Sequence, residues 1–155
     1  MKEMERVNLP PFQAAINEGV SGIMTSHAIY PALDAERPAT LSPLVLNQLL
    51  REKMCFEGLI ITDDLEMGAI AEHWGVAEGA AAAFEAGADI LLICKDQKYV
   101  PESLELIRGR VLRNEIPFQR LNTSYERIMR VRSRLLERKE WISMGNLKRY
   151  FKLRA

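Results

Sequence analysis

The 155-residue sequence predicts an α/β protein built around a parallel sheet. Three short runs rich in Ile, Leu or Val, each preceded by glycine, predict strands at residues 19–25, 58–62 and 87–94. Such nearly continuous apolar runs are typical of strands that are covered on both faces. Helical patterns separate the runs, and this alternation favours parallel strands joined by right-handed crossovers. Three strands are few, because a doubly wound sheet usually has about five or six and a barrel has about eight. The sequence therefore predicts part of a larger architecture.

The helices between and after the strands are predicted from hydrophobic periodicity and from start and stop signals. Ser42-Pro43 supplies an N-cap followed by proline at the first helical position. Gly87 supplies a C-terminal stop. Thr123 and Glu126 have the spacing of a capping box, which predicts the start of the last long helix. The predicted helices cover residues 10–18, 43–54, 78–86, 99–113 and 121–138.

The composition fits a globular protein, with 48% hydrophobic and 27% charged residues. No apolar run approaches the length of about 18–20 residues that a membrane-spanning helix needs. The first residues carry charges of both signs and lead into no apolar region, so no secretory signal is expected. The two cysteines, Cys55 and Cys94, form no C-x-x-C pair and are predicted to be reduced, buried thiols. These observations favour a cytoplasmic location.

The formal net charge of +0 conceals a basic C-terminal part. Residues 127–155 hold ten Lys and Arg against Glu137 and Glu140, a net charge of +8, so the preceding part carries −8. A basic tail can bind nucleic acid, but it can also be a solvated helix face that complements an acidic body. No aromatic-interleaved RNA-binding motif accompanies it. We therefore expect neither a nucleic-acid partner nor a membrane partner.

Polar side chains follow the predicted strands at their carboxyl ends. His27 follows the first strand, and Asp63 and Asp64 follow the second. Long connections come next, at residues 28–40 and 65–76. In parallel α/β proteins, functional groups gather at this edge and long loops there form binding walls. A lone histidine such as His27 is more often a hydrogen-bonded wall residue than a catalyst or a metal ligand.

Asp63 is the strongest candidate, because it directly follows a run of apolar and β-branched residues. A carboxylate there is costly to desolvate unless it is hydrogen-bonded or faces a wet cleft. The position is compatible with a nucleophile, a metal ligand, an orienting base or a structural role toward loop amides. Asp64 is expected to point elsewhere and to serve the loop. A Mg²⁺-binding phosphoryl module using Asp63, Asp64 and Lys95 stays open, although it would need a phosphoacceptor aspartate on a separate strand.

Three parts of the chain carry a family resemblance. They are Leu9-Pro-Pro-Phe-Gln-Ala-Ala-Ile16 with Ile23-Met-Thr-Ser-His-Ala-Ile-Tyr-Pro-Ala-Leu33, then Pro38-Ala-Thr-Leu-Ser-Pro43, and then Phe56-Glu-Gly-Leu-Ile-Ile-Thr-Asp-Asp-Leu-Glu-Met-Gly-Ala-Ile70. In order and spacing they resemble glycoside hydrolase family 3, in its bacterial β-N-acetylhexosaminidase branch. The similarity runs from about residue 8 to residue 95, and the segment from Arg120 to Arg130 looks like the helix that closes the catalytic barrel of that family.

The resemblance implies a (β/α)₈ TIM-like barrel of which this chain would hold the last three βα units and the C-terminal helices. It implies that Asp63 is the nucleophile and that His27 lines the sugar pocket. The implied chemistry is retaining hydrolysis through a covalent glycosyl-enzyme, on an N-acetylglucosamine-containing glycoside or muropeptide of cell-wall recycling, without a cofactor or a metal. Residues 1–138 would be barrel, and residues 139–155 a basic tail.

The resemblance also implies a second catalytic group. In that branch the acid/base is a histidine on a loop with a Lys-His-Phe-Pro-Gly-His-Gly-type motif, which this sequence does not contain. Neither His27 nor His73 lies in a matching context. Loss of acid/base catalysis costs about 10²–10⁴-fold, so the chain alone is expected to be weakly active or inactive. It would be a truncated form, a split half that pairs with an N-terminal half-barrel or with itself, or a non-catalytic carbohydrate-binding or structural remnant.

Overall fold

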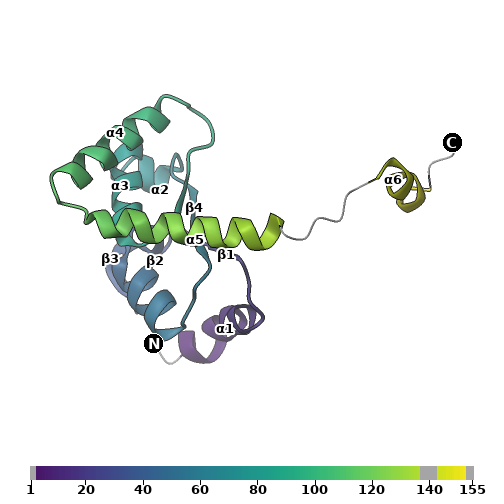
Figure 1. Ribbon diagram of the computed structural model, residues 1–155. Helices are drawn as coiled ribbons and strands as arrows, with labels where there is room; N and C mark the ends of the chain where they lie inside the picture. Colours follow the sequence, from purple (N-terminus) through teal and green to yellow (C-terminus); the bar gives the residue numbers. More distant parts are fainter. Residues whose placement is uncertain (1–2, 137–142, 153–155) are drawn as a thin grey trace.

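The computed structural model describes residues 3–136 and 143–152 (Figure 1). Its centre is a parallel sheet with the order β1-β4-β5, formed by β1 (Gly22–Met24), β4 (Leu59–Asp64) and β5 (Ile90–Leu92). β1 and β5 fall within the predicted apolar runs, and β4 begins within its run and extends two residues past it, to Asp64, so the prediction of an α/β fold with a parallel sheet is confirmed. The described residues form an open sheet and no closed barrel.

The side chains of β4 alternate between the two faces of the sheet, as the pleat of a strand requires. Ile60 and Thr62 are fully buried, whereas Ile61 and Asp63 are partly exposed. Met24 of β1 pairs in register with Ile61 and is 55% exposed. The sheet therefore has one covered face and one open face, and Asp63 lies on the open face at the carboxyl end of the central strand.

Two helices, η3 (Leu44–Lys53) and α3 (Val76–Ala86), form the core with the covered face. The core joins leucines of η3, alanines of α3 and Ile60 of the sheet; its fully buried members include Leu46, Ile60, Leu65 and Ile70. Gly87 ends α3 with φ +130, and a Cβ there would lie 2.7 Å from Oδ1 of Asn47. The predicted glycine stop is thus confirmed, because a side chain would strain the backbone and collide with η3.

The N-terminal helices pack beside this core, in the order η1 (Met4–Asn8) and α1 (Leu9–Asn17). After β5 come α4 (Tyr99–Leu112), α5 (Phe118–Leu136) and α6 (Met144–Tyr150). Helix α5 runs across the amino ends of the strands, where Arg134 donates to Oγ of Ser21 at 2.8 Å, just before β1 (Figure 1). None of the described helices is long and apolar enough to span a membrane.

The start of α5 differs from the prediction. The helix begins at Phe118, directly after Pro117, and not at the capping-box spacing of Thr123 and Glu126. Thr123 lies inside the helix, where its hydroxyl donates to the carbonyl oxygen of Gln119 at 2.8 Å. The predicted start is wrong because a proline just before the helix sets the required backbone angle one turn earlier.

Short elements occupy both predicted loops. Residues 28–40 contain β2 (Ile29–Tyr30), the antiparallel β3 (Asp34–Pro38) and the start of η2 (Ala39–Leu41), and residues 65–76 contain α2 (Gly68–Ala71). Asp34 fixes the hairpin, because its carboxylate accepts from the Ser42 hydroxyl at 2.6 Å and from two hairpin amides. The bond from Ser42 holds the pKa of Asp34 below its usual range, against the opposing effect of desolvation.

Both cysteines are free thiols, but both are exposed. The expectation of buried thiols is therefore wrong. Cys55 lies at the end of η3 with φ 56, where the backbone turns outward, and Cys94 follows β5 at the open carboxyl edge. An apolar sequence context did not bury either residue, because each stands beyond the last residue of its element.

Candidate active site

The candidate active site lies at the carboxyl end of β4. Asp63 is partly exposed there, and one hydrogen bond to its carboxylate is present in the described residues, from the amide of Asp64 to Oδ1 at 2.8 Å. No described side chain donates to Oδ2. Asp63 therefore lies on the open face of the sheet with its carboxylate held by one described hydrogen bond.

The neighbouring carboxylates are used within the protein. Oδ1 of Asp64 accepts from the amides of Glu66 at 3.1 Å and Cys94 at 3.3 Å. The carboxylate of Glu66 accepts from the amides of Lys95 and Asp96, the latter at 2.9 Å. These bonds join the loop after β4 to the loop after β5. The structural role expected for Asp64 matches this geometry, and the amide of Lys95, not its ammonium group, makes the contact.

His27 lies beside the same strand end, with both ring nitrogens hydrogen-bonded. Nε2 is 2.9 Å from the carbonyl oxygen of Asp64, and Nδ1 is 2.9 Å from Oγ1 of Thr40. Thr40 is fully buried and also lies 2.7 Å from the hydroxyl of Thr25. The expectation that His27 lines a sugar pocket stays a prediction; the contacts of its nitrogens are to the protein.

The second histidine lies in a hollow that His27 also lines. His73 and Trp74 line it together with His27, between the β2–β3 hairpin and α2. His73 is exposed, as expected for a loop residue. Within residues 3–136 and 143–152, no three His, Cys, Asp or Glu side chains lie close enough together to hold a metal ion.

The carboxyl edge is rich in acidic groups, and they contribute to a raised pKa of the Cys94 thiol. Desolvation raises the pKa of the Cys94 thiol most, and the negative charge and hydrogen bond of Asp64 raise it further. Glu66 and Asp63 act in the same direction at longer range. The thiolate form of Cys94 is therefore disfavoured beside these carboxylates.

A second carboxylate lies at the opposite, amino end of the sheet. Asp89 directly precedes β5, and its side chain is fully buried. Oδ2 accepts from Arg51 at 2.6 Å and from the amide of Ile60 at 3.0 Å, while Oδ1 accepts from Ser124 at 2.6 Å and Arg127 at 3.3 Å. Sequence reasoning missed this cluster, because each partner lies 29 or more residues from Asp89 in the chain.

Two arginines beside Asp89 also hold the backbone. Arg51 donates to the carbonyl oxygens of Phe56 at 2.7 Å and Gly58 at 2.6 Å, and Arg120 donates to that of Phe84 at 2.9 Å. Burial lowers the pKa of Arg51 to about 10, with Asp89 opposing the change. Burial likewise lowers the pKa of Arg120. The Asp89 cluster thus joins η3, the start of β5 and α5. Both oxygens of the Asp89 carboxylate are hydrogen-bonded.

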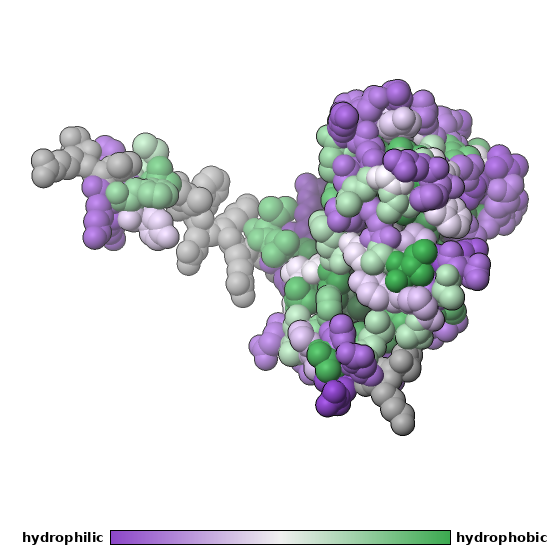
Figure 2. Space-filling model, turned by 180° about the vertical axis from the view of Figure 1, so that it is seen from behind, coloured by the Kyte–Doolittle hydropathy of each residue, from purple (hydrophilic) through white to green (hydrophobic). Residues whose placement is uncertain are grey.

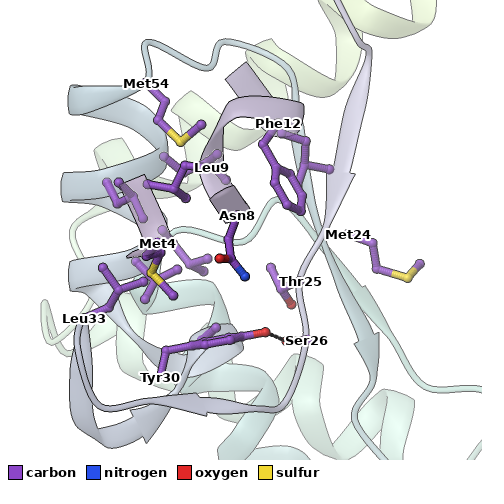
Figure 3. Close-up of a pocket in the computed structure, with 16 residues that line it drawn as sticks. Met4, Asn8, Leu9, Phe12, Met24, Thr25, Ser26, Tyr30, Leu33 and Met54 are labelled. Carbon is purple, nitrogen blue, oxygen red and sulfur yellow. Dashed lines mark hydrogen bonds between the residues drawn. The ribbon is translucent and has the colours of Figure 1, made fainter. Parts of the chain in front are cut away.

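The free edge of β1 borders an apolar hollow of about 320 Å³ (Figure 3). Figure 3 shows Leu9 and Phe12 of α1 on one side and Tyr30 on another, with the hydroxyl of Tyr30 bonded to Ser26 at 3.2 Å. Met24 of the strand also lines the hollow. From behind, Figure 2 shows hydrophobic residues gathered between hydrophilic margins. Apolar surface therefore borders the free edge of β1 within the described residues.

Comparison with known proteins relates this arrangement to one family. Residues 1–131 match the family described as the glycosyl hydrolase family 3 N terminal domain. A beta-hexosaminidase of Methylococcus capsulatus is 40% identical over 110 residues, which is 71% of this chain and 33% of that protein. One from Neisseria meningitidis serogroup C is 38% identical over 108 residues, covering 70% and 30%.

The solved structures give the same result. A glycoside hydrolase family 3 beta-N-acetylglucosaminidase from Paenibacillus sp. str. FPU-7 superposes with a TM-score of 0.86 at 34% identity. The superposition covers 92% of this chain and 28% of that one. The chain therefore spans about a third of the length of its curated relatives, and the similarity extends over a fragment of the catalytic domain.

Proposed function

We propose that this chain, which belongs to glycosyl hydrolase family 3, carries the nucleophile half of a retaining β-N-acetylhexosaminidase site, with Asp63 as the nucleophile. One observation carries the proposal. At the carboxyl edge, the carboxylates of Asp64 and Glu66 each accept two backbone amides, whereas Asp63 accepts one and faces the open side. Asp63 is held by one local hydrogen bond on the open face of the sheet, whereas Asp64 and Glu66 are used to join the two loops.

The proposed chemistry needs two groups. One attacks the anomeric carbon and forms a glycosyl-enzyme; the other protonates the leaving oxygen and then activates water. Asp63 supplies the first. We assign the second to neither histidine of this chain, because His27 is bonded to Thr40 and to the Asp64 carbonyl oxygen, and His73 lies in the loop after α2, beside the β2–β3 hairpin. By itself, this chain should therefore carry out the first step only with substrates whose leaving group departs without being protonated.

We further propose that β1, β4 and β5 are the last three strands of a barrel and that another polypeptide segment packs on the free edge of β1. The edge strand and the apolar surface beside it support this, because an unpaired strand edge favours pairing with a further strand. The segment would be an N-terminal half-barrel or a second copy of this chain. An N-acetylglucosamine-containing glycoside or a muropeptide is the proposed substrate, from the names of the similar proteins.

Trapping of the glycosyl-enzyme tests the proposal. A dinitrophenyl β-N-acetylglucosaminide has a leaving group that departs without protonation, so Asp63 can attack it unaided. Hydrolysis of the ester is slow without a general base. The purified chain should therefore gain the mass of one N-acetylhexosamine residue, and peptide mapping should locate it on Asp63.

The matched variants are Asp63→Asn and Asp64→Asn. The first should gain no mass, whereas the second keeps an oxygen that can accept the loop amides and should still be labelled. Labelling that persists in Asp63→Asn would overturn the assignment. A folded wild-type chain that is never labelled would favour a non-catalytic carbohydrate-binding or structural remnant instead.

A further inference from the structure

We propose that His27 is a positioning residue for Asp63, acting through the backbone of Asp64. This inference rests on the proposed function of Asp63, but it is drawn from different contacts. His27 touches neither carboxylate oxygen of Asp63 within hydrogen-bonding distance; its contact with the site is the carbonyl oxygen of Asp64.

Asp64 is held at each of its polar groups. Its amide donates to Oδ1 of Asp63 at 2.8 Å, and its carboxylate accepts from Glu66 and Cys94. Its carbonyl oxygen accepts from the amide of Met67 at 3.1 Å and from Nε2 of His27 at 2.9 Å. Because the amide of Asp64 orients Asp63, whatever fixes the Asp64 backbone also fixes the nucleophile. His27 supplies the contact to Asp64 that comes from the loop after β1 and not from the loops after β4 and β5.

His27 is itself anchored on buried hydroxyl groups. Nδ1 lies 2.9 Å from Oγ1 of Thr40, which is fully buried and lies 2.9 Å from the carbonyl oxygen of Ser26 and 2.7 Å from the hydroxyl of Thr25. The backbone of the segment is tied as well, since the amide of Thr40 donates to Ser26 at 3.2 Å. The imidazole is therefore fixed from the covered side and directed at Asp64.

The hydrogen-bond partners determine the protonation pattern. A carbonyl oxygen only accepts, so Nε2 of His27 must carry a proton. In the neutral ring Nδ1 is then an acceptor, and Thr40 donates to it while Thr25 donates to Thr40. In the imidazolium, Nδ1 donates to Thr40, whose hydroxyl turns to the carbonyl oxygen of Ser26. The bond from Nε2 to the Asp64 carbonyl oxygen is present in both protonation states. A positioning role requires such a constant bond, whereas an acid/base role does not require it.

Substitutions separate this role from a sugar-contacting one. In Gln, Nε2 is the same number of bonds from Cα as Nε2 of histidine, so His27→Gln keeps a donor for Asp64. In Asn, Nδ2 matches Nδ1, so His27→Asn keeps the group facing Thr40 and loses the contact with Asp64. His27→Ala loses both, and His73→Gln is the matched control in the exposed loop. Circular dichroism checks that each variant is folded.

The first readout is the rate at which the dinitrophenyl glycoside labels Asp63, measured against glycoside concentration. His27→Asn and His27→Ala should lower the limiting rate constant by about 10- to 100-fold, the cost typical of a misplaced reacting group. His27→Gln and His73→Gln should stay within a few-fold of wild type, and the half-saturating concentration should change little. Equal losses in His27→Gln and His27→Ala, or a loss confined to the half-saturating concentration, would overturn the inference.

The second readout does not depend on glycosyl labelling of Asp63. Nitrogen-15 NMR should find Nε2 of His27 protonated, and the Asp64 amide should exchange slowly with solvent in wild type and His27→Gln but faster in His27→Asn and His27→Ala. If the wild-type chain is not labelled but this pattern holds, the function proposed for Asp63 fails and the positioning contact stands. If the Asp64 amide exchanges equally in all variants, the positioning role is wrong whatever the labelling shows.

Discussion

Each end of the parallel sheet carries an aspartate, and the surroundings of the two carboxylates differ. At the carboxyl end, Asp63 has one hydrogen bond from the adjacent amide and faces the open side. At the amino end, the side chain of Asp89 is fully buried and bonded to Arg51, Arg127 and Ser124. We expect Asp89, bonded at both oxygens at the amino end, to stabilise the fold, whereas Asp63 at the carboxyl end is the proposed nucleophile. Position in the sheet, and not residue type, separates the two roles.

The largest expected contrast is at Asp63 itself. Asp63→Asn should abolish glycosyl labelling and leave the melting temperature close to that of wild type, because Asn still accepts the single bond from the Asp64 amide. Mass spectrometry and thermal melting on the same preparation measure both. A marked loss of stability in Asp63→Asn would erase the distinction between the two ends.

Asp89→Ala should produce the reverse pattern. It leaves Arg51 and Arg127 partly buried without a carboxylate, and removing one partner of a buried ion pair costs about 3–5 kcal/mol in the free energy of unfolding. Urea denaturation measures this, with Asp96→Ala, an exposed carboxylate at the other end, as the control that should change little. Similar midpoints for both variants would show that the Asp89 cluster does not stabilise the fold.

A smaller change tests the same cluster from α5. Ser124 donates to Asp89 and accepts from Arg120, each at 2.6 Å, so Ser124→Ala should cost about 1–3 kcal/mol in the free energy of unfolding. The matched control is Thr123→Ala on the same helix, since the Thr123 hydroxyl bonds only its own helix backbone. The prediction fails if the neighbouring variant loses as much stability as Ser124→Ala.

The smallest effect is on pH dependence at the carboxyl edge. Desolvation and the charge of Asp64 raise the pKa of Cys94, so less thiolate is present at a given pH and alkylation should require a higher pH than at an ordinary thiol. Iodoacetamide labelling of each cysteine across a pH series measures this, with Cys55 as the internal reference. Asp64→Asn should move the Cys94 alkylation profile to lower pH. An unchanged profile would show that the charge of Asp64 does not raise the pKa of Cys94.

Much of the fold was predictable because its signals are local. The apolar runs after Gly58 and Gly87 predicted two of the strands, and the stop at Gly87 holds through both its φ of +130 and the closeness of Asn47. The α5 start was mistaken because Thr123 and Glu126 have a capping spacing in sequence, while Pro117 begins the helix earlier. Both cysteines were placed in the core wrongly, since an apolar neighbourhood in sequence does not specify which side of an element end is covered.

The sequence by itself determined where Asp63 lies: periodicity and the glycine before the run identify the strand, and the strand's end identifies the edge. Only the tertiary structure decided what surrounds it. The bond from His27 to Asp64 spans 37 residues, and the bond from Arg51 to Asp89 spans 38. Such pairs meet because parallel crossovers bring distant strand ends together, and no spacing in the chain encodes which side chains then come within hydrogen-bonding distance.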